Sequence, residues 1–183
     1  MTIHPSSPSG RSDVEPLVWR DIRPVPPQGR ETTRHGDQRS VTVRLSGHSL
    51  HTPADARVHV VSALRAWGVP VDVTQDLRAI TSELTTNSVT HTRSAHLDVS
   101  ALLTEKEASV VVIDRGPYRP LAPHQADPDD EHGRGLALVR ALASRWEARP
   151  YGEGTAVWAA IALPEHTRPH PCEVETDAAR THR

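Results

Sequence analysis

The sequence has little of what would hold a chain together by covalent bonds or metal ligands. Its 183 residues include a single cysteine, Cys172, which excludes an internal disulfide and a cysteine-based zinc site. The longest apolar run, from Ala156 to Leu163, is far shorter than the ~20 residues that a membrane-spanning helix needs. No apolar segment follows a basic start at the N-terminus. We therefore expect a cytoplasmic protein that has no membrane partner.

Phenylalanine is absent and lysine occurs once, as Lys106, so arginine carries nearly all of the positive charge. The formal net charge is -2, and no dense basic cluster is present, which argues against direct binding of nucleic acid. The sequence contains no Gly-x4-Gly-Lys-Ser/Thr phosphate loop. It also lacks the Val-Ala-Ile-Lys strand and the His-Arg-Asp loop of conventional protein kinases. These absences exclude two common nucleotide-binding folds.

Composition divides the chain into three parts. Residues 1–39 are rich in proline and charge and poor in apolar side chains, so they cannot bury enough surface to offset chain entropy. We expect disorder there, apart from weak docking of residues 14–22. Residues 40–164 have the length and apolar content of one domain. Residues 165–183, rich in Pro, His, Glu and Thr, are expected to be a disordered tail.

Periodicity predicts the elements of the central part. They are, in order, a strand at 41–45, helices at 54–67 and 72–91, strands at 95–103 and 108–113, a helix opening at Gly133, and a hairpin of 146–150 and 155–163. Thr52 is the predicted N-cap of the first helix. Its predicted buried side is Val58, Val61, Leu64 and Ala66. Residues 118–132 have no periodic pattern, and a loop of that length is usually a functional lid or disordered.

Glu83 and Asn87 are the first candidate pair for chemistry. They lie one turn apart on the predicted helix at 72–91, at one edge of its apolar stripe. That stripe consists of Val73, Leu77, Ile80 and Leu84. A carboxamide oxygen suits Mg²⁺, and a carboxylate one turn away can accept a proton or orient a nucleophile. Taken alone, the pair also fits an ordinary surface helix.

Two later features suit a nucleotide. Asp114 and Gly116 stand where an apolar strand ends. There a carboxylate can accept a hydrogen bond from an exocyclic amine, and a glycine lets the backbone approach a flat ring. Gly133 and Gly135 open a helix, where bare amides and the positive end of the helix dipole suit a phosphate tail. Taken alone, the first feature also fits a plain turn and the second a flexible N-cap.

In this order and spacing, the features resemble the ATP-binding domain shared by gyrase, Hsp90, histidine kinases and MutL. The resemblance covers roughly residues 41–163. Glu83-Leu-Thr-Thr-Asn87-Ser-Val-Thr-His91 resembles the N box of that family. Asp114-Arg-Gly116 resembles its first glycine box, and Gly133-Arg-Gly135-Leu-Ala-Leu-Val resembles its second. Because it is short and lacks a dimerisation hairpin, the domain is similar to anti-sigma-factor serine/threonine kinases and their actinobacterial relatives.

The resemblance implies a Bergerat-type fold, an α/β (α+β) two-layer sandwich with a mixed sheet and helices on one face. It implies ATP and Mg²⁺ as cofactors. The implied roles are Mg²⁺ ligand for Asn87, catalytic base for Glu83, adenine contact for Asp114, base-pocket lining for Gly116, phosphate contacts for Gly133, Arg134 and Gly135, and support of the adenine end for Thr155. This chain departs from the family where Pro117 and Tyr118 replace a second glycine of the first box.

Two functions follow from the resemblance. The first is a protein serine kinase that phosphorylates a small anti-anti-sigma (STAS-type) protein and sequesters a sigma factor; it is motivated by the intact Glu83 and Asn87. The second is a nucleotide-dependent binding module that grips a regulatory partner without transferring phosphate; it is motivated by the altered glycine box and the acidic residues 127–131. Similar proteins often dimerise, so a homodimer is a further expectation of the resemblance.

Overall fold

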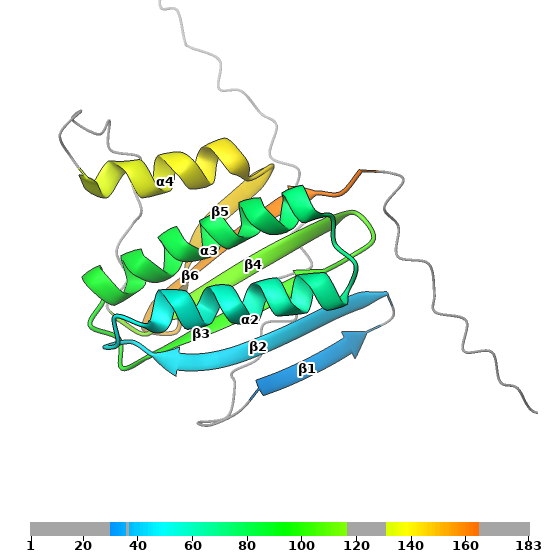
Figure 1. Cartoon of the computed structure of the whole chain (residues 1–183). Helices are drawn as coiled ribbons and strands as arrows, with labels where there is room; N and C mark the ends of the chain where they lie inside the picture. Colours follow the sequence, from blue (N-terminus) through cyan, green and yellow to red (C-terminus); the bar gives the residue numbers. More distant parts are fainter. Residues whose placement is uncertain (1–29, 36, 117–130, 165–183) are drawn as a thin grey trace, which may run out of the picture.

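The computed structural model describes residues 30–35, 37–116 and 131–164. Six strands form one sheet in the order β1-β2-β3-β4-β6-β5. The elements are, in chain order, β1 (Arg30–His35), β2 (Gln38–Ser46), α2 (Thr52–Ala66), α3 (Val71–His91), β3 (His96–Leu103), β4 (Glu107–Asp114), α4 (Glu131–Leu142), β5 (Arg145–Tyr151) and β6 (Gly154–Ala162). Figure 1 shows α2, α3 and α4 on the same face of the sheet, which confirms the two-layer sandwich.

The expected mixed sheet is wrong for the described strands, because every pair of neighbours is antiparallel. The connections explain the difference. Short turns join β1 to β2, β3 to β4 and β5 to β6, and such turns require antiparallel neighbours. Between β2 and β3, the helix pair α2 and α3 returns the chain to the end where β2 stopped, so β3 also runs in the opposite direction.

The edge strand β1 corrects the predicted boundary at residue 40. Residues 30–35 pair with β2, from Arg30 opposite Val43 to His35 opposite Gln38, although 1–39 was expected to be disordered. The segment Arg-Glu-Thr-Thr-Arg-His has no apolar side chain, so its composition gave no sign of a core strand. Main-chain pairing at a sheet edge requires no buried side chain, and charged residues are common there. Residues 1–29 and the tail 165–183 lie outside the described residues.

Helix α2 begins at Thr52, so Thr52 is not the predicted N-cap; that position belongs to His51. The Thr52 hydroxyl is buried and donates to the Ser46 carbonyl. The predicted buried side is also wrong in part, since Val58 is 68% exposed. The side that faces the core consists of Thr52, Ala56, Val60, Ala63 and Leu64. Small residues such as Ala56 and Ala63 let the helix lie close to the sheet. The prediction relied on apolarity alone and therefore selected the larger Val58 and Val61.

Helix α3 follows its prediction closely. Its apolar stripe, Val73, Leu77, Ile80 and Leu84, is buried in the core between the helices and the sheet. That core receives alternate residues of the strands, such as Val99 of β3, Val110 of β4 and Ala159 of β6. Strands β3, β4 and β6 are buried along almost their whole length, on both faces. None of the described helices has both the length and the apolar character of a transmembrane helix.

Candidate functional site

The C-terminal half of α3 carries Glu83 and Asn87, and both side chains are half-buried. Gly135 of α4 packs against both side chains. A Cβ atom added at Gly135 would lie 2.6 Å from Glu83 Oε2 and 3.6 Å from Asn87 Nδ2. The missing side chain therefore lets α4 approach α3 at the level of this acid and amide. The structure brings together three of the residues that the sequence predicted to act together.

Gly133 and Arg134 lie in the first turns of α4, two and three residues after its start at Glu131. The predicted opening of the helix at Gly133 is thus slightly late. The side chain of Arg134 lies outside the described part of the structure, and so do residues 117–130, which include the altered Pro117-Tyr118 pair and most of the lid predicted at 118–132. Residues 131 and 132 of that predicted loop belong to α4. Their predicted roles stay predictions.

Asp114 ends β4 and is buried, on the same face of the sheet as the helices. The backbone N–H of Gly116 donates to Asp114 Oδ1 at 3.0 Å, and the backbone N–H of Thr155 also donates to this carboxylate. Burial raises the pKa of Asp114 above its ordinary value, while these two hydrogen bonds oppose the rise. The result is a fixed, water-shielded carboxylate that can accept a further hydrogen bond from an amine.

Thr155 stands directly opposite Asp114 in the β4–β6 ladder and is itself buried. The preceding residue, Gly154, packs against the Asp114 main chain so closely that an added Cβ would lie 1.9 Å from the Asp114 carbonyl oxygen. The resemblance to the ATP-binding family implied that Thr155 supports the adenine end of the pocket. The contact that the structure gives runs through its backbone N–H, so Thr155 holds the Asp114 carboxylate in place.

Gly116, just after β4, packs against the end of α3. An added Cβ at Gly116 would lie 2.1 Å from the carbonyl oxygen of Thr92, the C-cap of α3. Ser94 secures the same junction, because its hydroxyl accepts a hydrogen bond from the Arg115 backbone N–H at 2.9 Å. Sequence reasoning missed Thr92 and Ser94 as positioning residues. The one available signal was the pair of hydroxyl residues, Thr92 and Ser94, directly after the helix predicted at 72–91.

Both halves of the predicted site therefore border the same stretch of α3. Gly135 contacts Glu83 and Asn87, and Gly116 contacts Thr92, five residues beyond Asn87. At about 1.5 Å of rise per residue, the two contact points lie about 7 to 8 Å apart along the helix axis. Apart from Gly133 and Arg134, the site residues predicted from separate motifs form one connected region on the helix side of the sheet.

The donor set fits a magnesium ion that a nucleotide shares. In the described part of the chain, no group of three or more His, Cys, Asp and Glu side chains gathers as a protein-held metal centre would require. Mg²⁺ bound through phosphates needs only one or two protein oxygens and keeps several waters. The half-buried carboxamide of Asn87 supplies such an oxygen, one helical turn from the half-buried Glu83.

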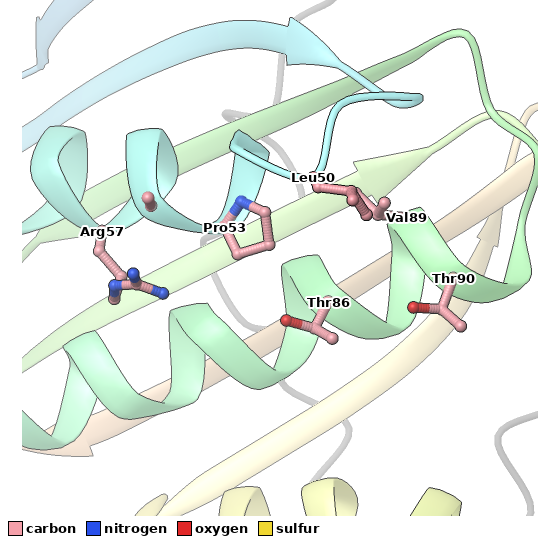
Figure 2. A pocket seen from close by; sticks show the side chains of 7 residues that line it. Leu50, Pro53, Arg57, Thr86, Val89 and Thr90 are labelled. Atoms are coloured by element: carbon pink, nitrogen blue, oxygen red, sulfur yellow. The ribbon is translucent and has the colours of Figure 1, made fainter.

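A groove of about 280 Å³ lies elsewhere, between the start of α2 and the outer side of α3 (Figure 2). Its lining consists of Leu50, Pro53, Ala54, Arg57, Thr86, Val89 and Thr90. Glu83 and Asn87 face α4 instead, as their contacts with Gly135 show. The groove is shallow, and Leu50 at its rim is 89% exposed. It is therefore not the region where the predicted residues gather.

Comparisons with known proteins identify the family and support the fold. The model of the histidine kinase-like ATPase domain family matches residues 48–161. None of the curated proteins matches the chain. The RsbU and RsbW domains of Rv1364c from Mycobacterium tuberculosis are similar in structure, with a TM-score of 0.52 and 20% identity over 68% of this chain and 33% of that one. At this identity the likeness concerns the fold alone.

A second similar structure is the histidine kinase domain of the blue-light-activated histidine kinase EL346 from Erythrobacter litoralis. Its TM-score is 0.40, with 21% identity over 61% of each chain. The present chain thus spans about one third of the first structure's length and less than two thirds of the second's.

Proposed function

We propose, since the chain belongs to the family of histidine kinase-like ATPase domains, that it binds ATP with Mg²⁺ and phosphorylates a serine of a STAS-type anti-anti-sigma protein. In this role it acts as an anti-sigma factor that releases its sigma factor according to the state of that partner. The observation that supports the proposal best is the close approach of Gly135 to both Glu83 and Asn87. The choice of an anti-sigma kinase within the family rests on the motif resemblance described above.

Asp114 would select the adenine base. Its buried carboxylate is held by the backbone N–H groups of Gly116 and Thr155, so it can accept a hydrogen bond from the exocyclic amine without reorganising. Gly116 has no side chain and lies beside Asp114 and the end of α3, so its backbone can line a flat pocket for the base. Guanine carries a carbonyl at the corresponding position and would leave Asp114 facing an acceptor.

Asn87 and the start of α4 would hold the triphosphate. When bound, Mg²⁺ neutralises phosphate charge, and the carboxamide oxygen of Asn87 is the protein ligand that we assign to it. Gly133 lies in the first turn of α4, where backbone N–H groups have no partner within the helix, and Arg134 and Gly135 follow it directly. These groups and the arginine suit the negative charge of the phosphates.

Glu83 would act as the general base. Its carboxylate accepts the proton of the partner's serine hydroxyl while the serine oxygen forms a bond to the γ-phosphorus. The bond between that phosphorus and the bridging oxygen breaks, and ADP leaves with the electron pair. A half-buried carboxylate one turn from Asn87 is close to the phosphate end of the nucleotide and far from Asp114 along α3.

The test is phosphotransfer from Mg-ATP to STAS proteins of the same genome, measured for the wild type and for Glu83→Gln. We expect the variant to lose transfer by about a hundredfold or more, the usual contribution of a general base. Its ATP affinity, measured by titration calorimetry, should stay within about threefold, because the amide keeps the shape of the side chain. Asp76→Asn is the matched control, since Asp76 lies two turns earlier on the same side of α3.

One result would decide against the kinase, and another against Glu83 as its base. If the wild type binds ATP and a STAS partner but never labels it, the protein is the nucleotide-dependent binding module. If Glu83→Gln and Asp76→Asn lose transfer equally, Glu83 is not the base. Further parts of the proposal are one domain at about 40–164 extended by β1, action in the cytoplasm as a homodimer, and no direct contact with nucleic acid or membrane.

A further inference from the structure

The turn between α3 and β3 is held from several sides. We call it the clamp turn and define it as residues 92–95. Arg93 within it has a φ of 50°, a left-handed conformation that residues other than glycine seldom adopt. Such a conformation persists only where the surrounding contacts enforce it. The contacts of the clamp turn therefore identify the parts of the molecule that it joins.

Ser94 makes the central contacts of the clamp turn. It is 3% exposed, and its hydroxyl donates to the His96 carbonyl at 2.5 Å. The same hydroxyl accepts a hydrogen bond from the backbone N–H of Arg115 at 2.9 Å. One buried hydroxyl thus ties the first residue of β3 to the residue that directly follows Asp114, the last residue of β4.

Two glycines pack against the clamp turn, one after β2 and one after β4. An added Cβ at Gly47 would lie 1.7 Å from the Ser94 carbonyl oxygen, and the Gly47 N–H donates to the Ala95 carbonyl at 2.9 Å. An added Cβ at Gly116 would lie 2.1 Å from the Thr92 carbonyl oxygen. Backbones packed this closely leave the turn no space to shift alone. Its position is therefore fixed relative to the ends of both strands.

Ser94 is also the main described anchor of the segment that follows Asp114. Gly116, whose N–H donates to the Asp114 carboxylate at 3.0 Å, is the chain neighbour of Arg115. The Arg115 side chain gives little support, because it is 51% exposed and lies 3.7 Å from Asp98. The hydrogen bond from the Arg115 backbone N–H to the buried Ser94 hydroxyl is shorter and better shielded. It therefore fixes where the Gly116 N–H points.

We propose that Ser94 is a positioning residue for recognition of the base. Through Arg115 and Gly116, its hydroxyl holds the Asp114 carboxylate in the orientation that accepts a hydrogen bond from the exocyclic amine of adenine. This inference rests on the proposed binding of ATP. It concerns the base and not the phosphates, which the proposed function assigns to Asn87 and the start of α4.

The test compares the affinities for Mg-ATP and Mg-GTP, measured by titration calorimetry, in the wild type and in Ser94→Ala. Without the hydroxyl, the Arg115 N–H loses its acceptor, and the Asp114 carboxylate is no longer held in one orientation. We expect the preference for ATP over GTP to fall about tenfold, the order of one hydrogen bond. A general loss of stability would weaken both nucleotides equally and leave this ratio unchanged.

Two further variants separate hydrogen bonding from packing. Ser94→Cys keeps the shape but carries a thiol, which is a weak donor and acceptor, so it should lose the preference as Ser94→Ala does. Ser100→Ala is the matched control, because it also removes a buried hydroxyl, one that is hydrogen-bonded to Thr42 at 2.8 Å. Its preference should stay within about twofold of the wild type. If Ser94→Cys keeps the preference that Ser94→Ala loses, packing is responsible and the proposal is overturned.

A measurement without nucleotide separates this inference from the proposed function. Amide hydrogen exchange at Arg115 and Gly116 should become about tenfold faster in Ser94→Ala than in the wild type, because their anchor is gone. Unchanged exchange overturns the inference even where the wild type prefers ATP, and so does an unchanged preference in Ser94→Ala. If exchange accelerates but the wild type binds neither nucleotide, the proposed binding of ATP fails, and the role of Ser94 in base recognition fails with it.

Discussion

The two faces of the sheet are built in different ways. On the helix face, the cover is local in sequence, because α2, α3 and α4 each lie between strands that they pack on. The ends of β4 and β6 on that face carry the polar pair Asp114 and Thr155. The face opposite the helices, which we call the back face, has an apolar centre, and none of the described helices lies on it. This centre consists of Leu102, Val111, Ile113, Ala156, Trp158 and Ala160. The candidate site residues thus gather on the face that the helices cover.

Beside its apolar centre, the back face also holds a buried ion pair. Arg44 of β2 donates to both carboxylate oxygens of Asp98 on β3, at 2.7 and 2.8 Å. Arg115 adds a weaker contact at 3.7 Å from a side chain that is 51% exposed. Thr42 and Ser100 are hydrogen-bonded beside the pair at 2.8 Å. On the back face, the side chains near β2 therefore make polar contacts with one another, and the side chains near β6 make apolar contacts.

The largest effect should come from breaking this pair. Asp98→Ala leaves the Arg44 guanidinium charged, largely buried and without its bidentate partner, so we expect the free energy of unfolding to fall by about 3 to 5 kcal/mol. Urea denaturation measures the loss. Arg115→Ala is the control and should cost less than about 1 kcal/mol, since its contact is long and exposed. Equal losses in both variants would mean that water reaches the pair and that the back face is open.

A second comparison uses two consecutive residues of β4. Val110 faces the helices and Val111 faces the back, and both are fully buried. Each Val→Ala change removes two methyl groups, so each variant should lose about 1.5 to 3 kcal/mol of stability. Chemical denaturation of the pair under identical conditions compares the two faces directly. A loss below about 0.5 kcal/mol for Val111→Ala alone would show that the back face is not packed in solution.

The helix face was largely predictable from the sequence, because its periodic signals are local. The stripe of α3 and the positions of Glu83 and Asn87 follow from a repeat of 3.6 residues. Strand β4 was predicted from a continuous apolar run, and that same run contained the information about the back face. A strand without alternation is buried on both sides. Periodicity did not reveal what lies against the second side, because it carries no information about distant partners.

The errors have physical causes of the same kind. Strand β1 has no apolar residue and is held by main-chain pairing with β2, which composition does not report. The buried side of α2 consists partly of Ala56 and Ala63, whose small size matters for close packing and not for hydrophobicity. The contact of Gly135 with Glu83 depends on the angle at which α4 crosses α3. The order of the motifs predicted that Gly135 and Glu83 would lie together, but the distance between them depends on how the two helices pack.

The smallest expected effect is a pH-dependent change in stability on the helix face, which the back face should not show. Burial raises the pKa of Asp114 in the folded state, so folding favours its protonated form. Below the ordinary pKa of an unfolded Asp, this group costs no stability. As the pH rises through the raised pKa, the folded state must bury a charge, and stability falls. The Asp114→Asn side chain carries no charge. Its stability relative to the wild type should therefore increase between the ordinary pKa of an unfolded Asp and the raised pKa of folded Asp114, and stay constant at higher pH.

Thermal unfolding of the two proteins without nucleotide, in buffers from pH 3 to 8, measures this difference. Ser109→Ala is the matched control on β4, because Ser109 is buried on the back face and does not titrate. Its stability relative to the wild type should not change with pH. If the Asp114→Asn difference is equally flat, water solvates the Asp114 carboxylate freely. The helix face would then lack the dry, fixed acceptor that discrimination of adenine requires, and the back face would be the better ordered of the two.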